Sequence, residues 1–183
     1  PPLKDERINK IKQNLEKNEM SISNLNGFML CAIQDFHHPS WIEDSSVVRN
    51  KRIEHTKNCI ILADRLNAKT VSTEPGGPII GMPKENDLTM FENGINELIP
   101  LLEKTEVKLL IEPEPKMLIE NSDQFLEFMK RIDSKWVGLN FDIGHFYCVN
   151  EDPAELILKL YRYIEHIHLE DISKERVHNH LIP

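Results

Sequence analysis

The chain has 183 residues, of which 40% are hydrophobic and 28% charged, an ordinary composition for a folded domain with a sizeable core. Its 22 Lys and Arg residues against 30 Asp and Glu residues give a net charge of −8, which argues against nonspecific binding to nucleic acid or to an anionic membrane. Cys31, Cys59 and Cys148 are too far apart for a CxxC pair or a disulfide framework, so we expect a reducing, cytoplasmic setting.

Hydrophobic periodicity divides the chain into alternating helices and strands. Apolar residues recur every three or four positions in the predicted helices, whereas the predicted strands are short, apolar runs. In chain order, we predict a helix over 4–17, a strand over 21–25, a loop over 35–46, a helix over 47–67, a strand over 69–73, a helix over 87–103, a strand over 107–112, a helix over 122–132, a strand over 136–142, a helix over 152–163 and a strand over 166–169.

Helices that join consecutive strands make the sheet parallel. The later repeats recur roughly every 30 residues, close to one strand–helix unit of a (β/α)8 TIM barrel. We therefore predict an α/β fold, a single partial TIM-barrel domain over 1–183 with its helices outside. An open doubly wound sheet is the alternative, but Gly76-Gly77 is the only glycine pair and lacks the GxGxxG spacing typical of such folds.

The two ends of the sequence suggest part of a longer domain. The chain starts with Pro1-Pro2 and stops at Pro183, directly after a dense stretch of His, Asp and Glu. We expect neighbouring strands of a barrel to lie outside it. Strand edges without a neighbour favour aggregation or association, so a homo-oligomer is among the expectations.

Acidic and imidazole side chains follow four consecutive predicted strands. In a parallel barrel the carboxyl ends of the strands converge on one mouth, where catalytic residues are found. Divalent metals favour carboxylate oxygen and imidazole nitrogen ligands, so this pattern indicates a metal site. The residues are Glu74 after the second predicted strand, Glu112 and Glu114 after the third, Asp142 and His145 after the fourth, and His168, Glu170, Asp171, His178 and His180 after the last.

Taken singly, several polar residues are also compatible with an ordinary structural role. A Glu after one strand is usually a solvated loop residue, and we expect His37 and His38 to be exposed in their polar loop. His55 is expected on a helix surface. Of His166 and His168, we expect only one to face the barrel interior.

Three runs of the sequence, LLIEPEP, NFDIGH and HIHLEDI…RVHNHLIP, resemble the xylose isomerase-like TIM barrel superfamily. This superfamily contains sugar-phosphate isomerases and epimerases, and apurinic endonucleases of the endonuclease IV type. The most specific element is the DxGH pattern at Asp142-Ile143-Gly144-His145, followed at the expected distance by His168. The resemblance implies that the strands are the third to the seventh of the barrel.

The resemblance also implies a metal site and a reaction. Glu112, Asp142 and His168 correspond to ligands of a divalent ion (Mn, Zn, Co or Mg), which a Glu from an eighth strand would complete. Glu112 would also move a proton next to a substrate carbonyl, and His145 would bind a substrate hydroxyl or join the metal. Arg176 is expected to grip a phosphate or carboxylate, or to pair with Glu170 or Glu175, and Glu74 to contact substrate.

His178 and His180 leave the reaction open. The endonuclease branch of the superfamily builds a multi-zinc site with an Asp-x-His pair at about this place, so these two residues are expected at the metal site. The first interpretation is a metal-dependent sugar or sugar-phosphate isomerase or epimerase. The alternatives are a zinc-dependent phosphoesterase of the endonuclease type and a non-catalytic fragment. The expected partner is a small sugar or sugar phosphate, with neither nucleic acid nor membrane.

Overall fold

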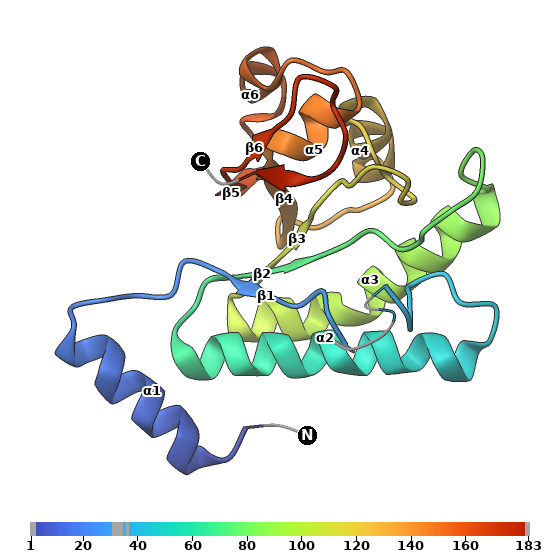
Figure 1. Ribbon diagram of the computed structural model, residues 1–183. Helices are drawn as coiled ribbons and strands as arrows, with labels where there is room; N and C mark the ends of the chain where they lie inside the picture. The colour runs from blue at the N-terminus through green and yellow to red at the C-terminus, as the bar shows by residue number, and fades with distance from the viewer. Residues whose placement is uncertain (1–2, 31–34, 36, 182–183) are drawn as a thin grey trace.

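The computed structural model describes residues 3–30, 35 and 37–181. Its centre is a five-stranded parallel sheet in the order β1-β2-β3-β4-β5 (Figure 1), which confirms the predicted partial TIM barrel with strands adjacent in chain order. The strands are β1 (Leu25–Asn26), β2 (Thr70–Thr73), β3 (Lys108–Ile111), β4 (Val137–Asp142) and β5 (Ile164–His168).

Six helices accompany the described sheet. They are α1 (Asp5–Lys17), α2 (Ser46–Leu66), α3 (Glu85–Thr105), α4 (Ser122–Met129), α5 (Ile143–Cys148) and α6 (Pro153–Leu160). In Figure 1, α2 and α3 lie side by side below β1 and β2, whereas α4, α5 and α6 gather around β4 and β5. A short antiparallel hairpin of β6 (Asp171–Ile172) and β7 (His180–Leu181) packs beside α5. No helix in the described part is long and apolar enough to cross a membrane.

Local signals explain where the helices begin and end. The Asp152 carboxylate accepts the amide of Ala154 at 2.8 Å, and Pro153 occupies the first helical position of α6, where no N–H is needed. Asn67 ends α2 in the left-handed conformation with a φ of 60°, which releases the chain toward β2. These caps agree with the predicted helix bounds to within a few residues.

The hydrophobic core lies between the sheet and the helices. Val71 and Leu109 on neighbouring strands are fully buried, as are Ile60 of α2 and Leu98 of α3. Neighbouring strands pair Val71 with Leu109, so these residues share the helix-facing side of the sheet. The alternate residues of the same strands therefore face the barrel interior and lead to the mouth.

The structure corrects two strand predictions. The first strand covers Leu25–Asn26 rather than 21–25. Before Leu25, a side-chain hydrogen bond takes the place of backbone pairing with β2, because Thr70 Oγ1 donates to the Ser23 carbonyl at 3.0 Å. The last strand begins at Ile164, earlier than predicted. A register shift next to Leu139 pairs Leu139 with Ile164 but Asn140 with His166, so one extra residue is inserted there.

Candidate metal and substrate site

Glu112, Asp142 and His168 converge at the carboxyl ends of β3, β4 and β5. The Nδ1 atom of His168 lies 2.8 Å from Oε1 of Glu112 and 3.5 Å from Oδ2 of Asp142. Each of the three residues offers one ligand atom within 4.8 Å of the others. Both carboxylates are buried, at 3% exposure, while His168 is partly exposed. The parallel topology thus brings together the three residues that the resemblance assigned to a metal.

Asn140 holds Glu112 in place, and sequence reasoning missed it. Its Nδ2 donates to Oε2 of Glu112 at 2.7 Å, and Asn140 is itself fully buried. Asn140 lies two residues before Asp142 on β4, so the two side chains share a face of the strand. The two-residue period of a strand that ends in Asp142 is the signal that could have found it.

The two oxygens of the Asp142 carboxylate make different contacts. Its Oδ1 accepts the amides of Gly144 at 2.9 Å and His145 at 3.0 Å, which starts α5 directly at the strand end. Its Oδ2 faces His168. Burial raises the pKa of Asp142, but the hydrogen bond with His168, the charge of His145 and the amide bonds outweigh burial and lower the pKa to about 2.

His168 is held as a cation between two acids. Hydrogen bonds with Asp142 and Glu112 raise its pKa to about 10, against the opposing effect of burial. Two buried carboxylates therefore attract positive charge to this point. A divalent cation would satisfy the same requirement with one imidazole and two carboxylate donors.

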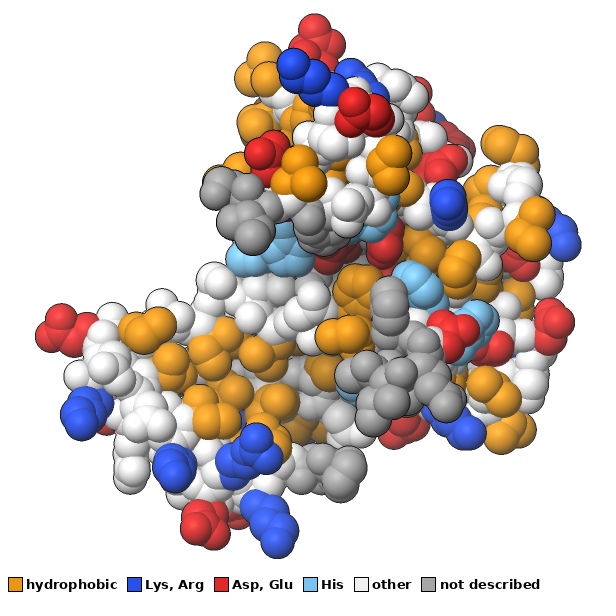
Figure 2. All heavy atoms as spheres, in the orientation of Figure 1, with side chains coloured by type: hydrophobic (Ala, Val, Ile, Leu, Met, Phe, Trp, Pro, Cys, Tyr) orange, Lys and Arg blue, Asp and Glu red, His pale blue; other side chains and the backbone are white. Residues whose placement is uncertain are grey.

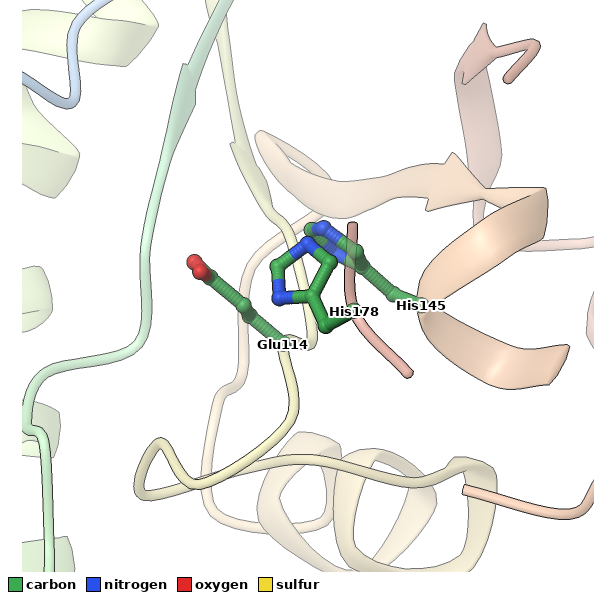
Figure 3. Close-up of side chains that lie close together, drawn as sticks. All are labelled: Glu114, His145 and His178. Atoms are coloured by element: carbon green, nitrogen blue, oxygen red, sulfur yellow. The ribbon is translucent and has the colours of Figure 1, made fainter. Parts of the chain in front are cut away.

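A second group of side chains consists of Glu114, His145 and His178. Each offers one ligand atom within 4.8 Å of the others, and they come from three separate segments of the chain (Figure 3). The rings of His145 and His178 meet edge to face, with centroids 4.6 Å apart. His145 Nδ1 lies 2.9 Å from the Pro113 carbonyl oxygen, which only accepts, so Nδ1 carries a hydrogen. Its Nε2 lies 4.0 Å from Oδ2 of Asp142.

Glu170 packs against Gly144 and explains the glycine of the DxGH pattern. A Cβ atom at position 144 would lie 1.8 Å from Oε1 of Glu170. Burial and the charge of Asp142 raise the pKa of Glu170 to about 8. Burial, with the charges of Glu74, Glu112 and Asp142, likewise raises the pKa of Glu114 to about 7. Burial and neighbouring carboxylates therefore favour the protonated forms of Glu114 and Glu170.

These residues line one cavity of about 560 Å³. In Figure 2, pale-blue histidine and red acidic side chains gather in the hollow between the upper and lower parts of the view. The lining residues are Asn26, Phe28, Glu112, Glu114, Asp142, His145, Ile167, His168, Leu169, Glu170 and His178. The cavity is large enough for a small polar ligand beside the candidate metal ligands.

Two residues expected to bind substrate have other partners. Glu74 is fully buried, accepts Arg52 Nη2 at 3.3 Å and lies 2.9 Å from Nδ1 of His37. Arg176 donates to the Tyr147 carbonyl at 2.9 Å and stacks over its ring at 4.1 Å, rather than pairing with Glu170 or Glu175. Neither Glu74 nor Arg176 is among the residues that line the cavity, and a role of either residue in substrate binding stays a prediction.

Several histidine predictions also change. His37 is half-buried against Glu74 and His55 Nε2 lies 3.1 Å from the Gly27 carbonyl, so neither is an ordinary surface residue. His38 is exposed, as predicted. His166 and His168 lie on the same face of β5, with ring centroids 5.3 Å apart, because residues two apart on a strand share a face. The side chain of His180 lies outside the described part of the structure.

The whole chain, residues 1–183, matches the family model described as xylose isomerase-like TIM barrel. This fold and its strand-end site are those of a TIM-barrel protein, and the chain belongs to the xylose isomerase-like TIM barrel family. A 93-residue stretch, 51% of the chain, is 29% identical to an inosose dehydratase from Clostridium perfringens.

Two solved structures share the fold. A D-tagatose 3-epimerase-like protein superposes with a TM-score of 0.73 at 23% identity, over 92% of this chain and 62% of that one. The IolI protein with a bound zinc atom superposes with a TM-score of 0.74 at 18% identity, over 91% of this chain and 57% of that one. The sequence match spans 31% of the inosose dehydratase. The chain thus corresponds to part of the length of these proteins.

Proposed function

We propose that the protein is a metal-dependent enzyme that removes a proton from the carbon beside a carbonyl group of a polyhydroxylated ketone. The observation that carries this proposal is the convergence of Glu112, Asp142 and His168 on one point at the mouth of the barrel. The same proton abstraction begins both the epimerisation and the dehydration of a hydroxyketone. Both reactions occur in the names of similar proteins, the inosose dehydratase and the epimerase-like structure.

The donor atoms fit a divalent cation. Two carboxylate oxygens and one imidazole nitrogen match the preferences of Zn, Mn or Co, and less closely those of Mg. The raised pKa of His168 is a second sign, since it reports two buried acids that attract a cation. The zinc atom bound in the IolI structure supports the assignment, although the particular metal stays a proposal. A bound ion would supply Lewis-acid polarisation of the carbonyl, which acidifies the neighbouring C–H.

The chain's own residues then bind and move the proton. Glu112 accepts it on a carboxylate oxygen, and Asn140 keeps that carboxylate oriented through Oε2. His145 orients a substrate hydroxyl through Nε2, since its Nδ1 is engaged by Pro113. Phe28, Ile167 and Leu169 add apolar side chains to the lining of the cavity.

Phosphate-ester hydrolysis is the second candidate function. It is favoured by the Glu114, His145 and His178 group, which offers donors for a further ion beside the first set. The acidic lining of the cavity opposes it, because a phosphodiester backbone is normally held by Lys and Arg. We therefore rank proton abstraction above phosphate-ester hydrolysis as the proposed function.

Solvent deuterium exchange tests the proposal. The full-length protein, loaded in turn with Zn²⁺, Mn²⁺ and Co²⁺, is incubated in D2O with a panel of ketoses and cyclic polyhydroxyketones, and loss of the α-proton is followed by NMR. Glu112→Gln should lower exchange at least about a hundredfold with little change in ligand binding, because an amide does not accept the proton. Asp142→Asn and His168→Ala should lower metal affinity first, with activity partly restored at high metal concentration.

The matched control is Glu127→Gln, which removes the charge of an exposed Glu paired with Lys130, away from the cavity. This variant should exchange protons at the wild-type rate. Cleavage of an abasic-site duplex, combined with no metal-dependent exchange of any ketone, would replace the proposal with the hydrolytic alternative.

A further inference from the structure

Glu170 lies at the candidate metal site, although the resemblance assigned it no role there. It follows His168 by two positions, directly after β5 ends, and it lines the same cavity. Its carboxylate offers a ligand atom that lies within 4.8 Å of ligand atoms from Asp142 and His145. Asp142 also belongs to the first group of donors, so one acid connects Glu170 to the candidate metal ligands.

The spacing of these donors fits a single coordination sphere. Two ligands on opposite sides of an ion, each about 2.0–2.3 Å from it, are about 4.0–4.6 Å apart. The donor atoms in each of the two groups that share Asp142 lie within 4.8 Å of one another, so an ion beside Asp142 reaches both groups. The charge of Glu170 also interacts with the charges of Glu112 and His168, which places it close to all three candidate ligands.

Gly144 gives the Glu170 carboxyl group the room to reach this point. A Cβ atom at position 144 would lie 1.8 Å from Oε1, 2.5 Å from Cδ and 2.6 Å from Cγ of Glu170, so a larger residue would displace the carboxyl group. Gly144 lies in α5 and is not among the glycines with a positive φ. The close approach of Glu170, and not the backbone conformation, is therefore what a side chain at this position would disturb.

Three carboxyl groups meet beside His168. Glu170 is hydrogen-bonded to Asp142 in the metal-free protein, and the charges of Asp142 and Glu112 repel that of an ionised Glu170. A divalent cation among the three groups would replace this repulsion with attraction to each carboxylate. Carboxylate oxygen is also a donor that Zn, Mn, Co and Mg accept.

We propose that Glu170 is a further ligand of the candidate metal ion, in addition to the three residues at the strand ends. Gly144 is the position that admits its carboxylate to the ion. The inference rests on the proposed function, because it concerns the ion of that site. It gives the ion one more carboxylate donor from this chain, on the segment that leads from β5 into the β6–β7 hairpin.

Co²⁺ binding to the full-length protein tests the proposal without any substrate. Competition with a chelator measures the affinity, and visible absorption of the saturated protein reports the ligand set. Glu170→Gln keeps the shape and removes the charge, so it should lower Co²⁺ affinity at least about tenfold and change the saturated spectrum. Glu170→Ala removes the donor altogether and should lower the affinity at least as much. Glu175→Gln, which neutralises an exposed acid in the β6–β7 hairpin, is the matched control and should keep both wild-type values.

Gly144→Ala provides an independent test of the same contact. The added methyl group displaces the Glu170 carboxyl group, so this variant should also lower Co²⁺ affinity at least about tenfold. In the Glu170→Ala background the carboxyl group is already absent. Gly144→Ala should then leave the remaining Co²⁺ affinity unchanged.

The possible results separate this inference from the proposed function. Wild-type affinity and spectrum in folded Glu170→Gln and Glu170→Ala, with affinity lost in Asp142→Asn, overturn the inference and leave the metal site standing. Weaker affinity with a wild-type saturated spectrum also overturns it, because Glu170 then contacts the ligands and not the ion. Loss of a second Co²⁺ ion alone, or no Co²⁺ binding by the wild-type protein, overturns it as well. Lowered affinity and a changed spectrum in Glu170→Gln, combined with no proton exchange of any ketone, would support the inference and contradict the proposed function.

Discussion

Arg52 Nη2 lies 3.3 Å from Oε1 of Glu74, and both side chains are fully buried. The pair joins α2 to the end of β2. Arg52 also donates to the carbonyls of Pro39 and Phe28, and Glu74 holds His37, so the pair anchors the loop that leads from β1 to α2. Its position beside the barrel mouth, outside the cavity lining, indicates a structural role.

Removing one partner of this pair should be costly. Arg52→Met leaves the Glu74 carboxylate buried without its cation, and should lower the free energy of unfolding by about 3–5 kcal/mol. Glu74→Leu should destabilise the wild-type protein but stabilise the Arg52→Met variant, because it then removes a buried acid that has lost its arginine partner. Urea unfolding of the four proteins measures both effects. Equal effects of Glu74→Leu in the two backgrounds would show that the pair is not coupled.

The metal-free protein should depend on pH through His168. Its folded-state pKa, about 10, lies above the ordinary value of 6.5, so its stabilising contribution is complete below about pH 6.5 and is lost as pH rises through 10. Thermal unfolding in the presence of a chelator should therefore show a steeper loss of Tm between pH 6.5 and 10 in the wild-type protein than in His168→Gln. Parallel curves for the two proteins would contradict the assigned contacts with Glu112 and Asp142.

Asp142, an acid of the same cluster, should give the opposite dependence of stability on pH. The pKa of Asp142, about 2, lies below its ordinary value of 3.8, so its contribution is complete above that value and is lost as pH falls toward 2. Asp142→Asn should reduce the loss of Tm at low pH. It should also reduce the loss of Tm above pH 6.5, because His168 then has one carboxylate partner fewer. The same thermal scans check this.

Gly144 and Glu170 should be energetically coupled. A methyl group on residue 144 would meet the Glu170 carboxyl at 1.8 Å, so Gly144→Ala should destabilise the wild-type protein by about 1–3 kcal/mol through overpacking. With Glu170→Ala the space is open, and Gly144→Ala should then be neutral or stabilising, because Ala favours a helix over Gly. A double-mutant cycle from denaturant unfolding measures the difference. A coupling energy near zero would mean that the two groups do not touch.

Arg176 should hold the β6–β7 hairpin, which carries His178 toward His145. Arg176→Ala removes the bond to the Tyr147 carbonyl and the stacking on its ring, so the hairpin should open more often while the barrel stays folded. Hydrogen exchange across 171–181 should speed up at least about tenfold, since a charge-assisted bond is lost. Lys174→Ala, an exposed change in the same hairpin, is the control. Unchanged exchange in Arg176→Ala would remove Arg176 from this role.

The fold was predictable because the hydrophobic periodicity of a strand or helix depends on residues that are close together in the sequence. The apolar runs before Glu112 and Asp142 identify buried strands, and parallel topology alone then brings their carboxyl ends together. The β5 start was not predictable, since the register shift next to Leu139 depends on the neighbouring strand rather than on local period. The short α5 was also missed, because it follows β4 without a loop and is started by the Asp142 side chain.

Side-chain partners were harder to predict than strand ends. The sequence places Glu74 and Arg176 near the mouth, but their partners, Arg52 and Tyr147, lie 22 and 29 residues away along the chain. No local pattern distinguishes a residue that faces a substrate from one that is already bonded to a distant neighbour.

Cobalt titration tests the central claim most directly, namely that Glu112, Asp142 and His168 hold a divalent ion. Visible absorption of Co²⁺ reports inner-sphere ligands, and ultrafiltration with elemental analysis counts the ions bound. We predict a Co²⁺ spectrum that is kept in Glu127→Gln and is lost or weakened at least about tenfold in affinity in Asp142→Asn and His168→Ala. A protein that binds no Co²⁺, or that binds it equally well in all of these variants, would contradict the account.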